Sequence, residues 1–135
     1  MSMMNKRILD CEWIILQALW GQDPQSMGEI IAGVQSAHPE IEWKYKTYHS
    51  YLRVMVDKKL IGCDVLNAKE KRYFPLVTRE EALEQESETL LARISEKSMA
   101  RMMAMLVQKA TLSESDKKEL TELFHTLQDE GGEQS

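Results

Sequence analysis

The sequence predicts a mainly α-helical protein with one small β-hairpin. Three observations support this prediction. Residues 43–61 show helical periodicity, with apolar side chains on one side and cationic or polar side chains on the other. Two short apolar-polar segments follow and flank a polar turn, as the strands of a hairpin do. A second stretch of helical periodicity, rich in Leu, Ile and Met, occupies residues 79–129.

The composition is ordinary for a soluble globular protein, with 43% hydrophobic and 29% charged residues. A chain of 135 residues can bury one core and carry an extension. We therefore expect a first domain at residues 1–78 and a helical domain at residues 79–129. Residues 130–135 are Gly, Glu, Gln and Ser, and we expect them to form a flexible tail.

Two helices are expected before residue 43. The first begins near Asp10, which is a good N-cap residue, and stops at Gly21. The second is capped by Ser26, and Glu29 three residues later completes a capping box. His38-Pro39 ends this helix, because the residue before a proline disfavours helical geometry.

The helix expected within residues 43–61 has two distinct faces, and we expect Gly62 to end it. Its apolar face suits a core and carries Tyr48, Tyr51, Leu52 and Met55. Its opposite face carries Lys46, His49, Ser50 and Arg53, with Asp57 at the far end. A helix of this width fits the DNA major groove. Any amphipathic helix shows two such faces, so the interpretation depends on the neighbouring elements.

The segment after this helix predicts a β-hairpin, with strands near residues 62–66 and 72–77. A hairpin directly after a basic helix forms the wing of a winged helix-turn-helix. Lys69, Lys71 and Arg72 then lie where they could touch phosphate or a minor groove. Charged residues on a short hairpin also protect its edge from aggregation. The sequence does not decide between these two roles.

The distribution of charge favours a nucleic-acid partner, although the net charge is −5. Residues 43–79 contain nine Lys and Arg against three Asp and Glu, a net charge of +6. Residues 80–135 contain six against thirteen, a net charge of −7. Because salt screens charges beyond about 10 Å, a phosphate backbone responds to the local excess. We expect the acidic second half to lie away from DNA.

The second half carries an apolar stripe on helices that have no core of their own to cover it. Thr78 to Glu81 and Ser113 to Asp116 resemble N-terminal caps, and residues 95–98 interrupt the run. A second copy of the chain is the simplest cover, so we predict a homodimer. The expected dimerisation residues are Leu90, Ile94, Met102, Met105, Leu106, Leu120, Leu123, Phe124 and Leu127. The methionines invite a metal-binding interpretation, but adaptable packing explains them more simply.

Nothing in the sequence predicts an enzyme, a metal site or a cofactor. It contains no Gly-rich phosphate loop, no paired Cys or His-x-x-x-His ligands and no nucleophile elbow. The two cysteines, Cys11 and Cys63, are expected to be reduced thiols of a cytoplasmic protein. No apolar run is long enough to span a membrane, and we expect no signal peptide.

These residues resemble the penicillinase and methicillin-resistance repressors and their copper-responsive relatives, which are bacterial winged-helix dimers. The most specific match is Trp43-Lys44-Tyr45-Lys46-Thr47, which is similar to the family's Trp-x-x-Lys-Thr entry to the recognition helix. The other matches are Glu12-Trp13 with Leu19-Trp20, Lys58 to Ile61, Arg72 to Val77, and Leu112-Ser113. They cover nearly the whole chain.

The resemblance implies a cytoplasmic transcriptional repressor that binds an inverted-repeat operator as a homodimer. Lys46 and Thr47 match the family motif directly, whereas helix geometry suggests His49, Ser50 and Arg53. The expected DNA-binding residues are Lys44, Lys46, Thr47, His49, Ser50, Arg53, Lys69, Lys71 and Arg72.

The chain departs from the family pattern in several places. Val54 replaces a usual Arg, and Lys59 replaces a usual Gly. Met105-Leu106 stands where antibiotic-responsive members are cleaved at an Asn-Phe bond, so a sensor-protease partner does not follow. Residues 129–135 lack the paired cysteines of copper-responsive members, which disfavours copper control by that route.

The alternative function is a winged-helix adaptor that binds protein rather than a specific DNA sequence. The acidic net charge of −5 favours it mildly. The +6 excess within residues 43–79 favours DNA, because an adaptor has no need of such a cluster.

Overall fold

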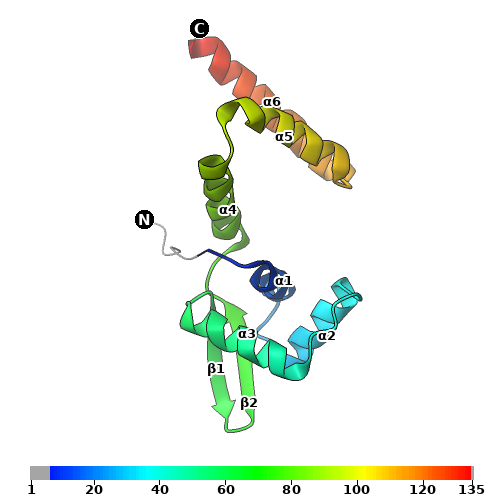
Figure 1. The fold of residues 1–135 in the computed structure, drawn as a ribbon, viewed down its shortest axis with the longest axis vertical. Helices are drawn as coiled ribbons and strands as arrows, with labels where there is room; N and C mark the ends of the chain where they lie inside the picture. Colours follow the sequence, from blue (N-terminus) through cyan, green and yellow to red (C-terminus); the bar gives the residue numbers. More distant parts are fainter. Residues whose placement is uncertain (1–6, 135) are drawn as a thin grey trace. The chain divides into compact units, whose positions relative to one another are not determined.

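The computed structural model describes residues 7–134, except for the side chains of Glu96 and residues 130–134. The elements, labelled in Figure 1, are α1 (Asp10–Leu19), α2 (Met27–Ala37), α3 (Tyr45–Asp57), β1 (Ile61–Asn67), β2 (Glu70–Pro75), α4 (Arg79–Arg93), α5 (Glu96–Lys109) and α6 (Glu114–Gln134). The predicted fold class, mainly helical with one small hairpin, is confirmed. The chain divides into two compact units, Met1–Thr89 and Leu90–Ser135.

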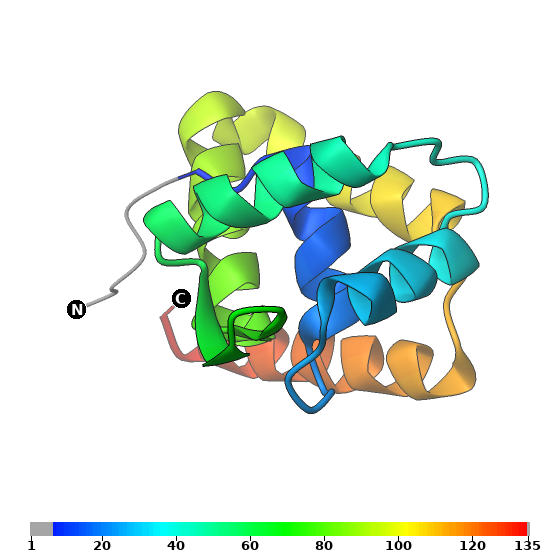
Figure 2. The same ribbon diagram turned by 90° about the horizontal axis from the view of Figure 1, so that it is seen from below.

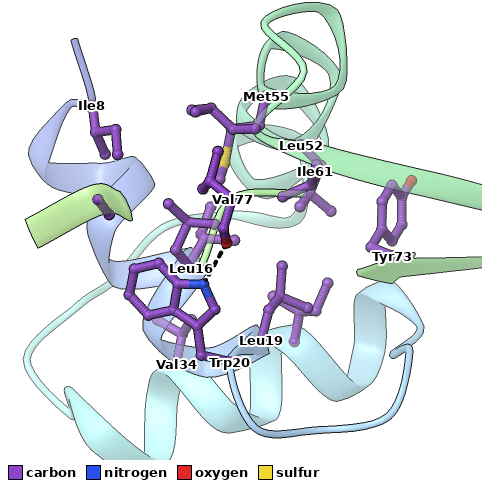
Figure 3. Packing of buried hydrophobic residues seen from close by; sticks show 14 of the residues in the cluster. Ile8, Leu16, Leu19, Trp20, Val34, Leu52, Met55, Ile61, Tyr73 and Val77 are labelled. Atoms are coloured by element: carbon purple, nitrogen blue, oxygen red, sulfur yellow. Dashed lines mark hydrogen bonds between the residues drawn. The ribbon is translucent and has the colours of Figure 1, made fainter. Parts of the chain in front are cut away.

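The first unit packs three helices and the hairpin around one apolar core. Helix α1 lies between α2 and α3 and contacts both, as Figure 2 shows. The apolar face expected for α3 packs into this core through Leu52, and Leu16 of α1 and Val34 of α2 are buried with it (Figure 3). Helix α3, the candidate recognition helix, therefore packs its apolar face against the core that α1 and α2 form with it.

Trp20 connects the end of α1 to the segment that leads into α4. Its indole Nε1 donates a hydrogen bond of 2.9 Å to the carbonyl oxygen of Val77, drawn as a dashed line in Figure 3. The guanidinium carbon of Arg79 lies 5.4 Å from the centre of the Trp20 ring, within the range of a cation–π contact. Ala82 of α4 is fully buried in the same core. The first turn of α4 thus belongs to the packing of the first unit.

The hairpin is antiparallel and is extended by one residue from the loop before α2. Its register pairs Gly62 with Phe74, and a Cβ atom at position 62 would collide with the Phe74 ring. Gln25 pairs with Tyr73 through two backbone hydrogen bonds of 2.9 and 2.7 Å. These bonds attach β2 of the hairpin to the loop that precedes α2.

The helix starts predicted from capping boxes are confirmed. In each, the cap hydroxyl accepts from the backbone N–H three residues later, and that residue's carboxylate accepts from the cap N–H. The pairs are Ser26 with Glu29, Thr78 with Glu81, and Ser113 with Asp116. The interruption expected at residues 95–98 also occurs, since α5 begins directly after Ser95.

The start of α1 differs from the prediction. Asp10 is the first helical residue rather than the N-cap, which is Leu9. The Glu12 carboxylate accepts the Leu9 backbone N–H at 2.9 Å. Glu12, in the first turn of the helix, thus accepts a hydrogen bond from one of the N–H groups that have no partner within the helix. The helix can therefore begin without a polar N-cap residue.

Helix α3 ends at Asp57, several residues before the Gly62 that was expected to break it. Lys59 has a φ of 63°, the left-handed conformation that usually takes glycine. The N–H of Leu60 bonds to the carbonyl of Met55, and the N–H of Lys59 bonds to that of Val56, both at 3.0 Å. This is a Schellman motif, whose left-handed position favours glycine and here holds a lysine.

A buried ion pair joins the start of α1 to the end of α3. Glu12 is 2% exposed, and both of its carboxylate oxygens accept from the Lys58 ammonium, at 2.7 and 2.9 Å. Lys58 also donates to the backbone carbonyl of Arg7 at 3.3 Å. Two residues far apart in the chain therefore fix one end of α3 against α1.

The second unit has no comparable core. No side chain among the described residues from Leu90 to Asp129 is buried. Helix α6 continues to Gln134, through residues 130–134 that were expected to form a flexible tail. Ser135 lies outside the described residues. The helical geometry of this unit is therefore not accompanied by a buried interior in a single chain.

We expect Lys58→Met to lower the free energy of unfolding by about 3 kcal/mol, because Glu12 would stay buried without its counter-charge. Urea unfolding at neutral pH measures this change. Lys59→Met is the matched control, because it removes an exposed neighbouring ammonium and should change stability by under about 0.5 kcal/mol. Equal losses in the two variants would contradict a structural role for the buried pair.

Candidate nucleic-acid interface

The outer face of α3 carries the cationic and polar side chains that the sequence predicted for it. Lys46, His49, Ser50 and Arg53 are exposed, whereas Tyr48, Leu52 and Met55 of the opposite face are buried. Within residues 7–134, no hydrogen bond or ion pair engages the side chains of Lys46, His49 or Arg53. These donors are therefore available to a ligand outside the chain.

Trp43 sets the direction in which the chain enters α3. It precedes the N-cap Lys44 and packs edge-on against Tyr48, with ring centres 5.3 Å apart, and against Tyr51, at 5.0 Å. The contact of Trp43, the residue before the N-cap, with Tyr48, the fourth residue of the helix, is a hydrophobic staple. Such a staple fixes the angle at which the chain enters a helix. The Trp of the Trp-x-x-Lys-Thr motif thus helps to orient α3, which carries Lys46 and Thr47.

Tyr48 contributes its ring and not its hydroxyl to this arrangement. Burial raises the pKa of Tyr48, and the hydroxyl has no hydrogen-bond partner in the described part of the chain. A buried hydroxyl without a hydrogen-bond partner costs free energy. The packing of the Tyr48 ring on Trp43 has to offset this cost.

Two hollows lie between α3 and the wing and bring together residues from both. One has a volume of about 320 Å³ and is lined by Tyr45, His49, Lys69 and Lys71, among others. The second, of about 340 Å³, is lined by His49, Arg53, Asp57, Cys63, Lys71 and Tyr73, among others. The two hollows adjoin, because His49, Lys71 and Tyr73 line both of them, and we refer to the two together as the groove. The fold therefore places cationic residues from α3 and β2 along the same surface.

Tyr73 lines both hollows from the wing. The side chain is 8% exposed, and burial is the main cause that raises the pKa of its hydroxyl. The neighbouring Cys63 thiol raises that pKa further. At neutral pH Tyr73 is uncharged, so it adds no negative charge to the groove.

Arg72 is placed differently from the other predicted wing residues. Its guanidinium donates to Glu29 at 2.7 Å and to Glu70 at 3.1 Å. The pKa of Glu29 is lowered, first by hydrogen bonds from the Ser26 backbone and hydroxyl and then by the charge of Arg72. Arg72 thus ties the wing to the first turn of α2, whereas Lys69 and Lys71 line the groove.

Two features of the interface were missed by the sequence reasoning. The first turn of α2, including Met27 and Gly28, lines the hollow of about 320 Å³. The capping box at Ser26 could have indicated it, because the N-terminus of a helix attracts anions. The second feature is a pair of exposed apolar residues on α3, Tyr45 at 64% and Val54 at 47% exposed.

The predicted dimerisation residues lie on the helices α4, α5 and α6, except for Ile94, which lies between α4 and α5, and none of them is buried in the chain. The exposed ones are Met105, Leu106, Leu123, Phe124 and Leu127, and the half-buried ones are Leu90, Ile94, Met102 and Leu120. A hollow of about 480 Å³ between α5 and α6 is lined partly by Leu120, Phe124 and Val107. Val107 and Met103 are exposed apolar residues that the sequence reasoning did not include.

Comparison with protein families settles which group of proteins the chain is part of. Residues 8–126 match the penicillinase repressor family over most of the chain's length. The chain belongs to the penicillinase repressor family. This confirms the resemblance drawn from the Trp43–Thr47 motif and makes the chain a member of a family of transcriptional repressors. A comparison with individual curated proteins gives no match.

Neither a membrane segment nor a metal-binding cluster is found in residues 7–134. None of the helices described there is both long and apolar enough to cross a membrane. In the same part of the chain, no three His, Cys, Asp or Glu side chains gather as metal ligands would.

Proposed function

We propose that the chain is a DNA-binding transcriptional repressor that acts as a homodimer on an inverted-repeat operator. We assign the DNA-binding domain to residues 1–78 and the dimerisation domain to residues 79–129, with the first turn of α4 packed on the core of the first. The observation that carries the proposal is the groove between α3 and the wing, which the unpaired side chains of His49 and Arg53 line together with Lys71. Membership of a repressor family supports the same conclusion.

Helix α3 and the cationic residues around it suit two parts of a DNA duplex, the base edges in the major groove and the phosphate backbone. An α-helix fits the major groove, so the outer face of α3 would contact base edges there. Arg53 can donate two hydrogen bonds to the O6 and N7 atoms of a guanine. Lys44, Lys46 and Thr47 at the start of α3, with Lys69 and Lys71 of the wing, would hold the phosphate backbone. The first turn of α2 offers backbone N–H groups for another phosphate.

The homodimer is supported by the second unit's lack of buried side chains. Leu123, Phe124 and Leu127 are all more than half exposed on α6. An apolar surface of this kind usually marks an association site. Because an inverted repeat has twofold symmetry, two copies of the chain would place one α3 on each half-site.

A fluorescence-anisotropy titration tests DNA binding. The duplexes are the upstream region of the chain's own gene and a scrambled sequence of equal composition, each at two salt concentrations. We expect saturable, salt-sensitive binding that prefers the native duplex. Arg53→Ala should weaken this binding by about 1–3 kcal/mol and relax the preference at one base pair. Equal or absent binding to both duplexes would favour the protein-adaptor alternative.

We expect Glu29→Gln to weaken binding about twofold, although the substitution removes a negative charge from a DNA-binding surface. The glutamine can still accept from the Ser26 N–H, so the capping box remains while the charge that holds Arg72 is lost. Glu42→Gln is the control, because it removes an exposed acid before α3 and should leave binding equal or tighter. Tighter binding by Glu29→Gln would mean that Arg72, once released, contacts the phosphates directly.

We expect Leu123→Glu to convert the dimer to monomers, because a charge at an apolar interface loses its hydration without gaining a partner. Sedimentation velocity over a concentration series measures the mass. The side chain is 54% exposed in the single chain and lies in the second unit, so the substitution should leave the core of the first unit intact. His125→Glu adds the same charge on the opposite side of α6 and should remain dimeric. A dimeric Leu123→Glu would place the interface elsewhere.

A further inference from the structure

Val54 lies outside the core of the first unit. It lies on α3 and is 47% exposed, and it belongs neither to the buried core nor to the partly buried residues that pack against it. Val56, two residues later, does pack against that core. An apolar side chain on the outer face of α3 is therefore free to contact something outside the chain.

The position of Val54 on α3 is defined by helical periodicity. At 100° per residue, it follows Ser50 by one turn and Thr47 by two, so these three residues share one flank of the helix. The opposite flank carries His49 and Arg53, which line the hollow against the wing. The outer face of α3 thus has a cationic flank beside the wing and a flank of small hydroxyl and methyl groups away from it.

The chemistry of the second flank matches one group in the major groove. Thymine is the only base that presents a methyl group there, and the other bases present hydrogen-bond donors and acceptors. A valine can make no hydrogen bond with its side chain, but it gains free energy when it covers a methyl group. Ser50 has no methyl group to offer, and Thr47 carries one but is only half-exposed, so Val54 is the exposed apolar side chain of this flank.

We propose that Val54 reads the 5-methyl group of one thymine in each operator half-site. This inference rests on the proposed function and extends it, since it names a residue that would determine which sequence is bound. Arg53 and Val54 are adjacent in the chain but lie on different flanks of α3. A guanine contact and a thymine contact would therefore fall on neighbouring parts of the same half-site.

The experiment begins with duplexes selected by the wild-type chain from a random pool. Each thymine of the preferred duplex is then replaced in turn by deoxyuridine, which removes only the methyl group. We expect one position per half-site at which the replacement raises Kd about fourfold for the wild type, the effect of losing one buried methyl contact. For Val54→Ala, the same replacement should change Kd much less, because alanine lacks the two γ-methyl groups of valine that would cover the thymine methyl.

Val65→Ala is the matched control, because it makes the same change at an exposed valine in the wing. Its Kd should keep the full fourfold response to deoxyuridine. A methyl effect that persists in Val54→Ala, or no methyl effect at any thymine, would overturn the inference while leaving DNA binding established. Failure to select any duplex would instead refute the proposed function, and the inference with it.

Discussion

The buried pair between Glu12 and Lys58 holds one end of α3 in place. The two residues are 46 positions apart, and their contact joins the first turn of α1 to the C-cap of α3. Glu12 also accepts the Leu9 N–H, so one carboxylate both begins α1 and anchors the end of another helix. A buried charge without a partner is strongly unfavourable, and this makes other placements of α3 costly. The buried pair thus acts as a geometric constraint more than as a source of net stability.

The opposite end of α3 is fixed by apolar contacts. Trp43 packs on Tyr48 and Tyr51, and the buried face of α3 completes the core behind them. With both ends held, the exposed face of α3 is presented as a rigid surface. The wing is attached separately, through the backbone pairing of Gln25 with Tyr73 and the Arg72 ion pairs. Helix and wing are therefore oriented by different contacts around one groove.

The parts of this structure that were predictable depend on neighbours in the sequence. The capping box of Ser26 and Glu29 spans three residues, and the two faces of α3 follow from its period. The Glu12–Lys58 pair was not predictable, because any of several acids could have met Lys58 across so long a separation. For the same reason the sequence placed Arg72 with the other cations of the wing, whereas the fold brings Glu29 beside it. Local hydrogen bonds can be inferred from spacing, but long-range ion pairs require the tertiary structure.

The two units differ in how their apolar surface is covered, and this difference bears on function. The first unit buries Trp20, Leu52 and Val77 within one chain, whereas no described side chain from Leu90 to Asp129 is buried. Fully burying a leucine contributes about 1.5–3 kcal/mol, so association of two chains would supply the stabilisation that the single chain lacks. On this proposal, folding of the second unit and pairing of the two recognition helices are one event. Any change that separates the chains would then also remove the second half-site contact.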